Sequence, residues 1–106
     1  LDGVTVSGGD PLLRPRPMGA FLRRLKERTR ADVWCYTGYT LEECLADPER
    51  RACLRWIDTL VDGRYVAALR DLSLPFRGSS NQRLIDIRSL ELFDEASASA
   101  ADRPRR

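Results

Sequence analysis

The chain has 106 residues, 42% of them hydrophobic, and a formal net charge of +2. This length allows one small domain with a modest core, and the near-neutral charge gives no reason to expect nucleic acid as a partner. No apolar run approaches the roughly 20 residues of a membrane span and no signal sequence stands out, so we expect a cytoplasmic protein that acts away from membranes.

The first element in chain order is a short strand that runs into two adjacent glycines. Residues 4–6 are β-branched and predict a buried strand, which Gly8 and Gly9 end. Glycines let the main chain approach a ligand closely, and α/β proteins place ligands at the carboxyl ends of strands. Ser7 and Asp10 add a hydroxyl and a carboxylate that suits a cationic group. A plain tight turn explains the same residues equally well.

Residues 15–30 form the first predicted helix, which begins at Pro15 or Pro17. Apolar side chains recur there at helical spacing and predict a buried stripe made of Met18, Phe21, Leu22 and Leu25. Arginines occupy much of the remaining surface, which is either a solvated face over a sheet or a site for an acidic partner.

Residues 32–37 predict a second strand, apolar enough to be central and parallel. Thr40 and Glu43 have the spacing of a capping box, and Asp47 with Pro48 has that of a new helix start. Three aromatic side chains in this region either line the mouth of a pocket or belong to the core: Trp34, Tyr36 and Tyr39.

A third strand is predicted at residues 57–63, where Asp62 and Gly63 close it. In a parallel sheet, Asp62 emerges at the same edge as Asp10. The two carboxylates therefore either bind a cationic or hydroxyl-rich ligand together or cap the helices that follow them.

Beyond this strand, residues 64–72 predict a short amphipathic helix and residues 84–87 predict a fourth strand. Residues 73–83 form a loop with so many hydrogen-bonding side chains that we interpret it as functional. Alternating strands and helices predict an α/β fold with a parallel sheet and flanking helices, either open or partly closed into a barrel. We expect the domain to cover residues 1–94 and a disordered tail to cover residues 95–106.

The three cysteines, Cys35, Cys44 and Cys53, lie nine residues apart. Ligands of zinc and of iron–sulfur clusters usually lie closer together in sequence. An odd number of cysteines without a secretory signal also argues against a disulfide framework. We therefore predict three reduced, partly buried packing residues.

Four segments, in order between about residues 1 and 87, together resemble a known family. Residues 3–12 are similar to the S-adenosylmethionine-binding loop of radical S-adenosylmethionine enzymes. Residues 34–40, 58–63 and 76–83 narrow the resemblance to the activating proteins of anaerobic ribonucleoside-triphosphate reductase. The last of these segments, FRGSSNQR, narrows it most.

The resemblance implies a partial (β/α) barrel of the radical S-adenosylmethionine type, truncated at its N-terminus. It implies two cofactors, S-adenosylmethionine and, in the full-length parent, a [4Fe-4S] cluster. In the family, the reduced cluster cleaves S-adenosylmethionine, and the resulting 5′-deoxyadenosyl radical takes a hydrogen from a glycine of the partner reductase. The implied partners are that anaerobic reductase and an electron donor such as a flavodoxin or a ferredoxin.

The resemblance also implies which residues bind the cofactor. The family's glycine loop meets the amino group of the methionine moiety, a role that falls here on Gly8, Gly9 and Asp10. Asp62 resembles a strand-end position where related activases contact the cofactor. Ser79 and Asn81 are expected to line the site or the path to the partner.

One departure from the family limits what this chain is expected to do. The family's Cys-x3-Cys-x2-Cys motif, which lies upstream of the glycine loop, has no counterpart here. We therefore expect the carboxyl-terminal portion of an activase, inactive by itself, with no catalytic residue or metal ligand of its own. The alternative is a standalone α/β module that binds a nucleotide-like ligand without redox chemistry.

Overall fold

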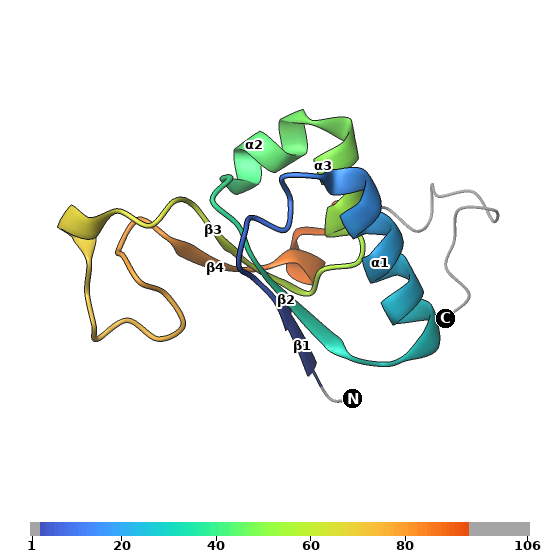
Figure 1. Ribbon diagram of the computed structural model, residues 1–106, viewed down its shortest axis with the longest axis horizontal. Helices are drawn as coiled ribbons and strands as arrows, with labels where there is room; N and C mark the ends of the chain where they lie inside the picture. Colours follow the sequence, from blue (N-terminus) through green and yellow to red (C-terminus); the bar gives the residue numbers. More distant parts are fainter. Residues whose placement is uncertain (1–2, 94–106) are drawn as a thin grey trace.

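The described part of the chain forms a four-stranded sheet with three helices on one side of it (Figure 1). The structure is a computed structural model that describes residues 3–93. The strands lie in the spatial order β1 (Gly3–Val6), β2 (Asp32–Tyr36), β3 (Thr59–Asp62) and β4 (Arg83–Asp86). The helices are α1 (Pro15–Arg28), α2 (Leu41–Ala46) and α3 (Pro48–Leu54), and two short 3-10 turns are η1 (Ala67–Leu69) and η2 (Ile87–Leu90).

The sheet is mixed. Strands β1, β2 and β3 are parallel neighbours joined by helical crossovers, whereas β4 pairs antiparallel with β3. The predicted α/β class is confirmed, but the expectation of a wholly parallel sheet is wrong. The reason lies in residues 63–82, which form an arm without a crossover helix and bring the chain back alongside the strand it left.

The core lies between the sheet and the helices. The register aligns Val6, Cys35, Leu60 and Ile85 across the four strands, and alternate residues of a strand share a face. These side chains belong to the same apolar cluster as Leu22 of α1 and Leu54 of α3. Two consecutive strand–helix–strand units therefore cover one face of the sheet with helices.

Helix α1 buries a narrower stripe than its sequence predicts. Leu22 is fully buried, and Met18 and Leu25 pack against the core, but Phe21 is 51% exposed. The expectation for Phe21 is wrong because the helix touches the sheet along one side only, and consecutive helical residues point about 100° apart. The helix also ends at Arg28 instead of Arg30, since Thr29 is already extended.

The two predicted helix starts after β2 are confirmed. Thr40 Oγ1 accepts a hydrogen bond from the Glu43 amide at 3.1 Å, and Glu43 Oε1 accepts one from the Thr40 amide at 2.9 Å. Asp47 accepts from the Glu49 amide at 3.3 Å, and Pro48 is the first residue of α3. These reciprocal contacts stop one helix and start the next within a few residues.

The amphipathic helix predicted at residues 64–72 is wrong. Only the 3-10 turn η1 forms there, and Tyr65 and Leu69 are exposed. The backbone of this segment pairs with the returning chain instead, because the Ser80 amide donates to the Leu69 carbonyl at 2.9 Å and Arg70 forms a bridge with Ser79. An apolar stripe without a surface to cover does not hold a helix.

Two strand boundaries also differ slightly from the expected ones. β3 begins at Thr59, and Ile57 before it is buried in the turn that leaves α3. β4 ends at Asp86, whose carboxylate accepts from the Arg88 amide and starts η2. The extent of the domain and the tail expected at residues 95–106 remain predictions, and the tail lies outside the described residues.

Candidate functional site

The carboxyl ends of the three parallel strands bring several glycines to one edge of the sheet. A cavity of about 250 Å³ lies there, lined by Gly8, Gly9, Asp10, Thr37, Gly38 and Gly63, among others. Each of the three strands contributes at least one glycine to this wall. A ligand at this edge can therefore reach main-chain groups from three neighbouring loops, as is usual for α/β proteins.

The glycine loop after β1 presents its backbone to open space. Gly8 has a φ of 75° and Gly9 a φ of 33°, both in the left-handed region that favours glycine. A Cβ at either residue would meet no atom within 4 Å. A second cavity, of about 590 Å³, lies on the other side of the loop and is lined by Ser7 and Met18. Packing therefore does not require glycine at these positions; backbone conformation does, and close ligand approach is possible.

The carboxylate of Asp10 is held by three donors within the protein. Its Oδ1 accepts from the Leu12 amide at 3.0 Å and from the Thr37 hydroxyl at 2.7 Å. Its Oδ2 accepts from the Gly38 amide at 2.8 Å. The side chain thus ties the loop after β1 to the loop after β2.

Asp62 lies at the expected edge, but its carboxylate points into the protein. It is 1% exposed and accepts from the Leu41 amide at 2.7 Å and from Arg83 at 2.5 and 3.1 Å. Hydrogen bonds to Asp62 and then to Glu42 raise the pKa of Arg83 above its usual value. Contrary to one interpretation of the sequence, Asp62 therefore does not cap a helix that follows it; its carboxylate meets the first residue of α2, which precedes it in the chain.

Ser79 and Asn81 belong to the base of the arm. The fully buried Ser79 hydroxyl accepts from the Val66 amide at 3.1 Å and donates to Asn81 Oδ1 at 2.6 Å. The amide nitrogen of Asn81 donates to the Arg64 carbonyl at 2.8 Å. The polar side chains of the loop at residues 73–83 thus hold its two chain segments together.

Three further residues line the cavity, and the sequence signals them unevenly. Tyr36 is one of the three candidate aromatic residues for a pocket mouth, and it lines the cavity. Gln82 also lines it and belongs to the loop at residues 73–83 that the sequence indicates as functional. Tyr65 lines it too, but no sequence pattern indicates this residue; a Cβ at Gly78 would stand 2.8 Å from its ring. Strand alternation directs Tyr36 away from the helix-covered face.

The other two candidate aromatics lie elsewhere. Trp34 packs edge-on against Phe76 of the arm, with ring centroids 5.1 Å apart. Tyr39 carries the guanidinium of Arg50 over its ring at 4.2 Å and accepts a hydrogen bond from it at 3.0 Å. Both rings therefore brace the loops around the cavity.

The cysteines do not fit an iron–sulfur cluster. All three are free and buried in the apolar core, which confirms them as packing residues. Desolvation raises the pKa of Cys44 to about 12 and that of Cys53 to about 11, whereas a cluster ligand must be a thiolate. Within residues 3–93, no three Cys, His, Asp or Glu side chains are arranged to hold a metal ion.

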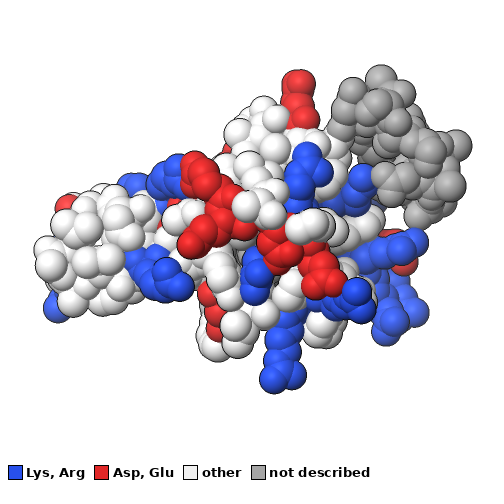
Figure 2. Space-filling model, turned by 90° about the horizontal axis from the view of Figure 1, so that it is seen from above, with Lys and Arg blue, Asp and Glu red and all other residues white. Residues whose placement is uncertain are grey.

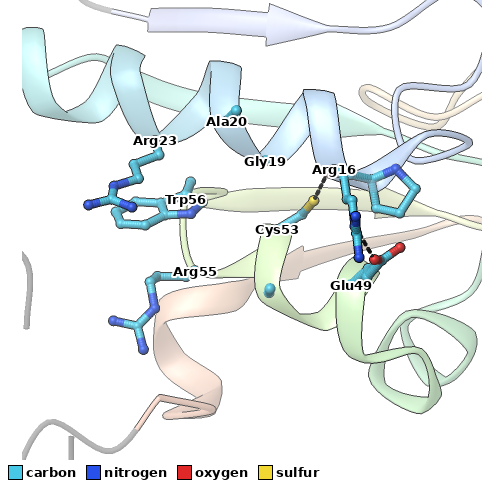
Figure 3. A pocket seen from close by; sticks show the side chains of 10 residues that line it. Arg16, Gly19, Ala20, Arg23, Glu49, Cys53, Arg55 and Trp56 are labelled. Carbon is cyan, nitrogen blue, oxygen red and sulfur yellow. Dashed lines mark hydrogen bonds and ion pairs between the residues drawn. The ribbon is translucent and has the colours of Figure 1, made fainter. Parts of the chain in front are cut away.

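A groove of about 420 Å³ lies between α1 and α3, away from the strand ends (Figure 3). Its floor includes Gly19 and Cys53, whose thiol donates to the Pro15 carbonyl at 3.1 Å. At its rim, Arg16 forms an ion pair with Glu49. Basic side chains elsewhere on the surface are likewise interspersed with acidic ones on the face shown in Figure 2. None of the site residues predicted from the sequence lines the groove between α1 and α3, whereas Gly8, Gly9 and Asp10 line the strand-end cavity and Asp62 and Asn81 line a further cavity of about 550 Å³.

Fold and site together define an α/β protein with a glycine-lined ligand site at the ends of parallel strands. The family described as "4Fe-4S single cluster domain" matches residues 1–85, and the chain belongs to that family. Within residues 3–93, no helix is long and apolar enough to cross a membrane.

Individual curated relatives narrow the family further than the domain match does. The chain is 45% identical over 83 residues to the anaerobic ribonucleoside-triphosphate reductase-activating protein of Haemophilus influenzae. It is also 45% identical over 85 residues to the protein of the same name from Escherichia coli K12. These matches cover 76% of this chain and 52% and 53% of the relatives, so the chain spans about half their length. No solved structure matches.

Proposed function

We propose that this chain is part of an activase that uses S-adenosylmethionine to place a glycyl radical on an anaerobic ribonucleoside-triphosphate reductase. Its relatives carry the name of that activating protein, and its family is a 4Fe-4S domain. The partners in this proposal are the reductase and an electron donor such as a flavodoxin or ferredoxin, in the cytoplasm.

The observation that carries the proposal is the strand-end cavity with its glycine loop. The loop exposes main-chain groups at Gly8 and Gly9, and loops from β2 and β3 face it across about 250 Å³. Backbone carbonyls suit the ammonium group of a methionine moiety, and the Tyr36 and Tyr65 rings suit the apolar part of a nucleoside.

In this proposal the cavity binds S-adenosylmethionine, which supplies the sulfonium that the family's radical chemistry cleaves. Gly8 and Gly9 provide the cradle, and Asp10 belongs to the same loop. Asp62, Ser79 and Asn81 do not line this cavity and make hydrogen bonds to neighbouring protein groups, which supports a role in holding the surrounding loops instead of direct contact. The two parallel strand–helix–strand units support a portion of a (β/α) barrel.

No step through the iron–sulfur cluster is assigned to this chain's residues, because its cysteines do not fit one. A cluster in the active protein would have to be held by residues other than Cys35, Cys44 and Cys53. The 106-residue chain on its own is accordingly proposed to be inactive.

The test uses the complete coding sequence that contains this chain, expressed and reconstituted with iron and sulfide without oxygen. Together with S-adenosylmethionine, a reductant and the anaerobic reductase, we expect 5′-deoxyadenosine and a glycyl-radical signal in electron paramagnetic resonance. Gly8→Val provides an inactive variant, since its side chain would project into the open space at the cavity and would also strain a backbone whose φ is 75°. Absence of a Cys-x3-Cys-x2-Cys motif from that coding sequence, or of product, contradicts the proposal.

Calorimetry on the 106-residue chain distinguishes the alternative, a binding module without redox chemistry. Micromolar binding of S-adenosylmethionine without any cluster would favour the module. The absence of a binding heat would favour the activase, in which the cluster contributes to S-adenosylmethionine binding.

A further inference from the structure

The glycine loop is fixed at both ends and free between them. At its start, Val6 is paired in register with Cys35 of β2. At its end, Asp10 accepts hydrogen bonds from Thr37 and Gly38, which follow the same strand. Only residues 7–9 span the interval, so the position of Asp10 determines where the glycine backbone lies.

Such fixation matters because two glycines in succession are otherwise the most mobile part of a chain. Ordering a glycine costs more backbone entropy than ordering any other residue, and a ligand that had to order both would bind less tightly. The space around Gly8 and Gly9 is open, since no atom lies within 4 Å of where a Cβ would stand, so packing does not restrain them. The restraint comes from the hydrogen bonds of Asp10.

A side chain of α3 binds the carbonyl groups of the residues that follow Asp10. Arg50 donates from Nε to the Leu12 carbonyl at 2.8 Å and from Nη2 to the Leu13 carbonyl at 3.4 Å. Leu12 itself is fully buried. The hydrogen bonds of Arg50 thus fix the segment after Asp10 independently of the glycine loop. Asp10 connects this fixed segment to the loop after β2.

We propose that Asp10 is a positioning residue, whose carboxylate holds the glycine loop against Thr37 and Gly38 without contacting the ligand. The proposal rests on the proposed function, since it concerns the same S-adenosylmethionine site. Oδ1 already accepts two hydrogen bonds and Oδ2 one, and Thr37 is only 6% exposed. The hydroxyl of Thr37 is therefore part of the loop's support.

Thr37→Val tests this, because it leaves the Asp10 carboxylate in place but removes the hydroxyl that donates to Asp10 at 2.7 Å and accepts from the Tyr39 amide at 3.2 Å. In the reconstituted protein we expect the KM for S-adenosylmethionine to rise about tenfold with kcat changed less than about twofold, as for one lost hydrogen bond to a charged group. Thr37→Ser restores the hydroxyl and should restore KM. If Asp10 contacted the ligand directly, Thr37→Val would leave KM unchanged while Asp10→Asn raised it, and that result would overturn the proposal.

Amide hydrogen exchange on the 106-residue chain tests the restraint without any cofactor. Asp10→Ala removes both carboxylate oxygens and with them the acceptor of the Gly38 amide, so exchange at Gly38 should accelerate by roughly tenfold. Asp86→Ala is the matched control, because Asp86 accepts from the amide two residues later, as Asp10 does, but closes no loop onto β2. Unchanged exchange at Gly38 in Asp10→Ala overturns the proposal.

The two experiments fail separately. If the wild-type protein does not cleave S-adenosylmethionine, the proposed function fails, and exchange at Gly38 still decides whether Asp10 restrains the loop. If cleavage occurs but Thr37→Val behaves as wild type, only the positioning role fails. Asp10→Asn provides a second perturbation should Thr37→Val not fold.

Discussion

Removing Arg83 should destabilise the protein by about 2 kcal/mol. The carboxylate of Asp62 is 1% exposed and accepts three hydrogen bonds, two of them from Arg83 and one from the Leu41 amide. Breaking a fully buried ion pair by removing one partner costs about 3–5 kcal/mol. Because the Arg83 side chain is 47% exposed, water can replace part of its contact, and we reduce the figure to about half.

The measurement is urea or thermal unfolding of Arg83→Met, with the midpoint expected to fall by roughly 10 °C. Arg83→Lys keeps the charge but not the paired donors, so it should fall between Arg83→Met and the wild type. Arg88→Met is the matched control: Arg88 is 70% exposed, its nearest carboxylate contact is 3.5 Å, and its loss should cost less than about 0.5 kcal/mol. Equal effects of Arg83→Met and Arg88→Met would refute the reasoning.

Three further predictions concern other parts of the molecule. Arg83 lowers the pKa of Glu42, so this carboxylate contributes stability above its unfolded pKa and loses it as pH falls through the folded value; Glu42→Gln should be less stable than wild type at pH 7 and equal to it in acid. Burial raises the pKa values of Cys44 and Cys53 to about 12 and about 11, so stability should fall as pH rises from about 9 through these values, with native thiols unreactive to a disulfide reagent at pH 8 and reactive in urea. Gly78→Ala would place a Cβ 2.8 Å from the Tyr65 ring, which is 52% exposed and can move aside, so it should cost less than about 1 kcal/mol in unfolding, and a larger loss would contradict this.

Local features of the fold could be predicted because their partners are close in sequence. The Thr40–Glu43 capping box and the Asp47–Pro48 helix start depend on contacts within three residues, and both are confirmed. The direction of β4 could not be predicted in this way. It depends on the arm, where Ser79 meets the backbone of Val66 thirteen residues earlier, and no helical or strand period reports such a contact.

In the candidate site, too, the local features could be predicted from the sequence and the long-range contacts could not. Strand-end placement of Asp10 and Asp62 follows from the strand pattern, and the structure confirms the edge. What each carboxylate does there depends on Thr37 and Arg83, which lie 27 and 21 residues away in sequence. The sequence does not show which distant donors a carboxylate will meet. It therefore leaves both ligand contact and capping open, and only the three-dimensional structure distinguishes them.

The saturated hydrogen bonding around the cavity determines how substitutions there should act. Asp10, Asp62, Ser79 and Asn81 each make at least two hydrogen bonds within the protein, and these contacts fix the positions of their side chains. The cavity is lined by the glycine loops, by Tyr36 and Tyr65, and by the polar residues Asp10, Thr37 and Gln82, among others. Substitution of a polar residue such as Thr37 should change the position of the backbone and be rescued by a conservative replacement. Substitution of Gly8 or Gly9 should both strain the backbone and fill the space that the proposed ligand needs, so no conservative replacement should rescue it.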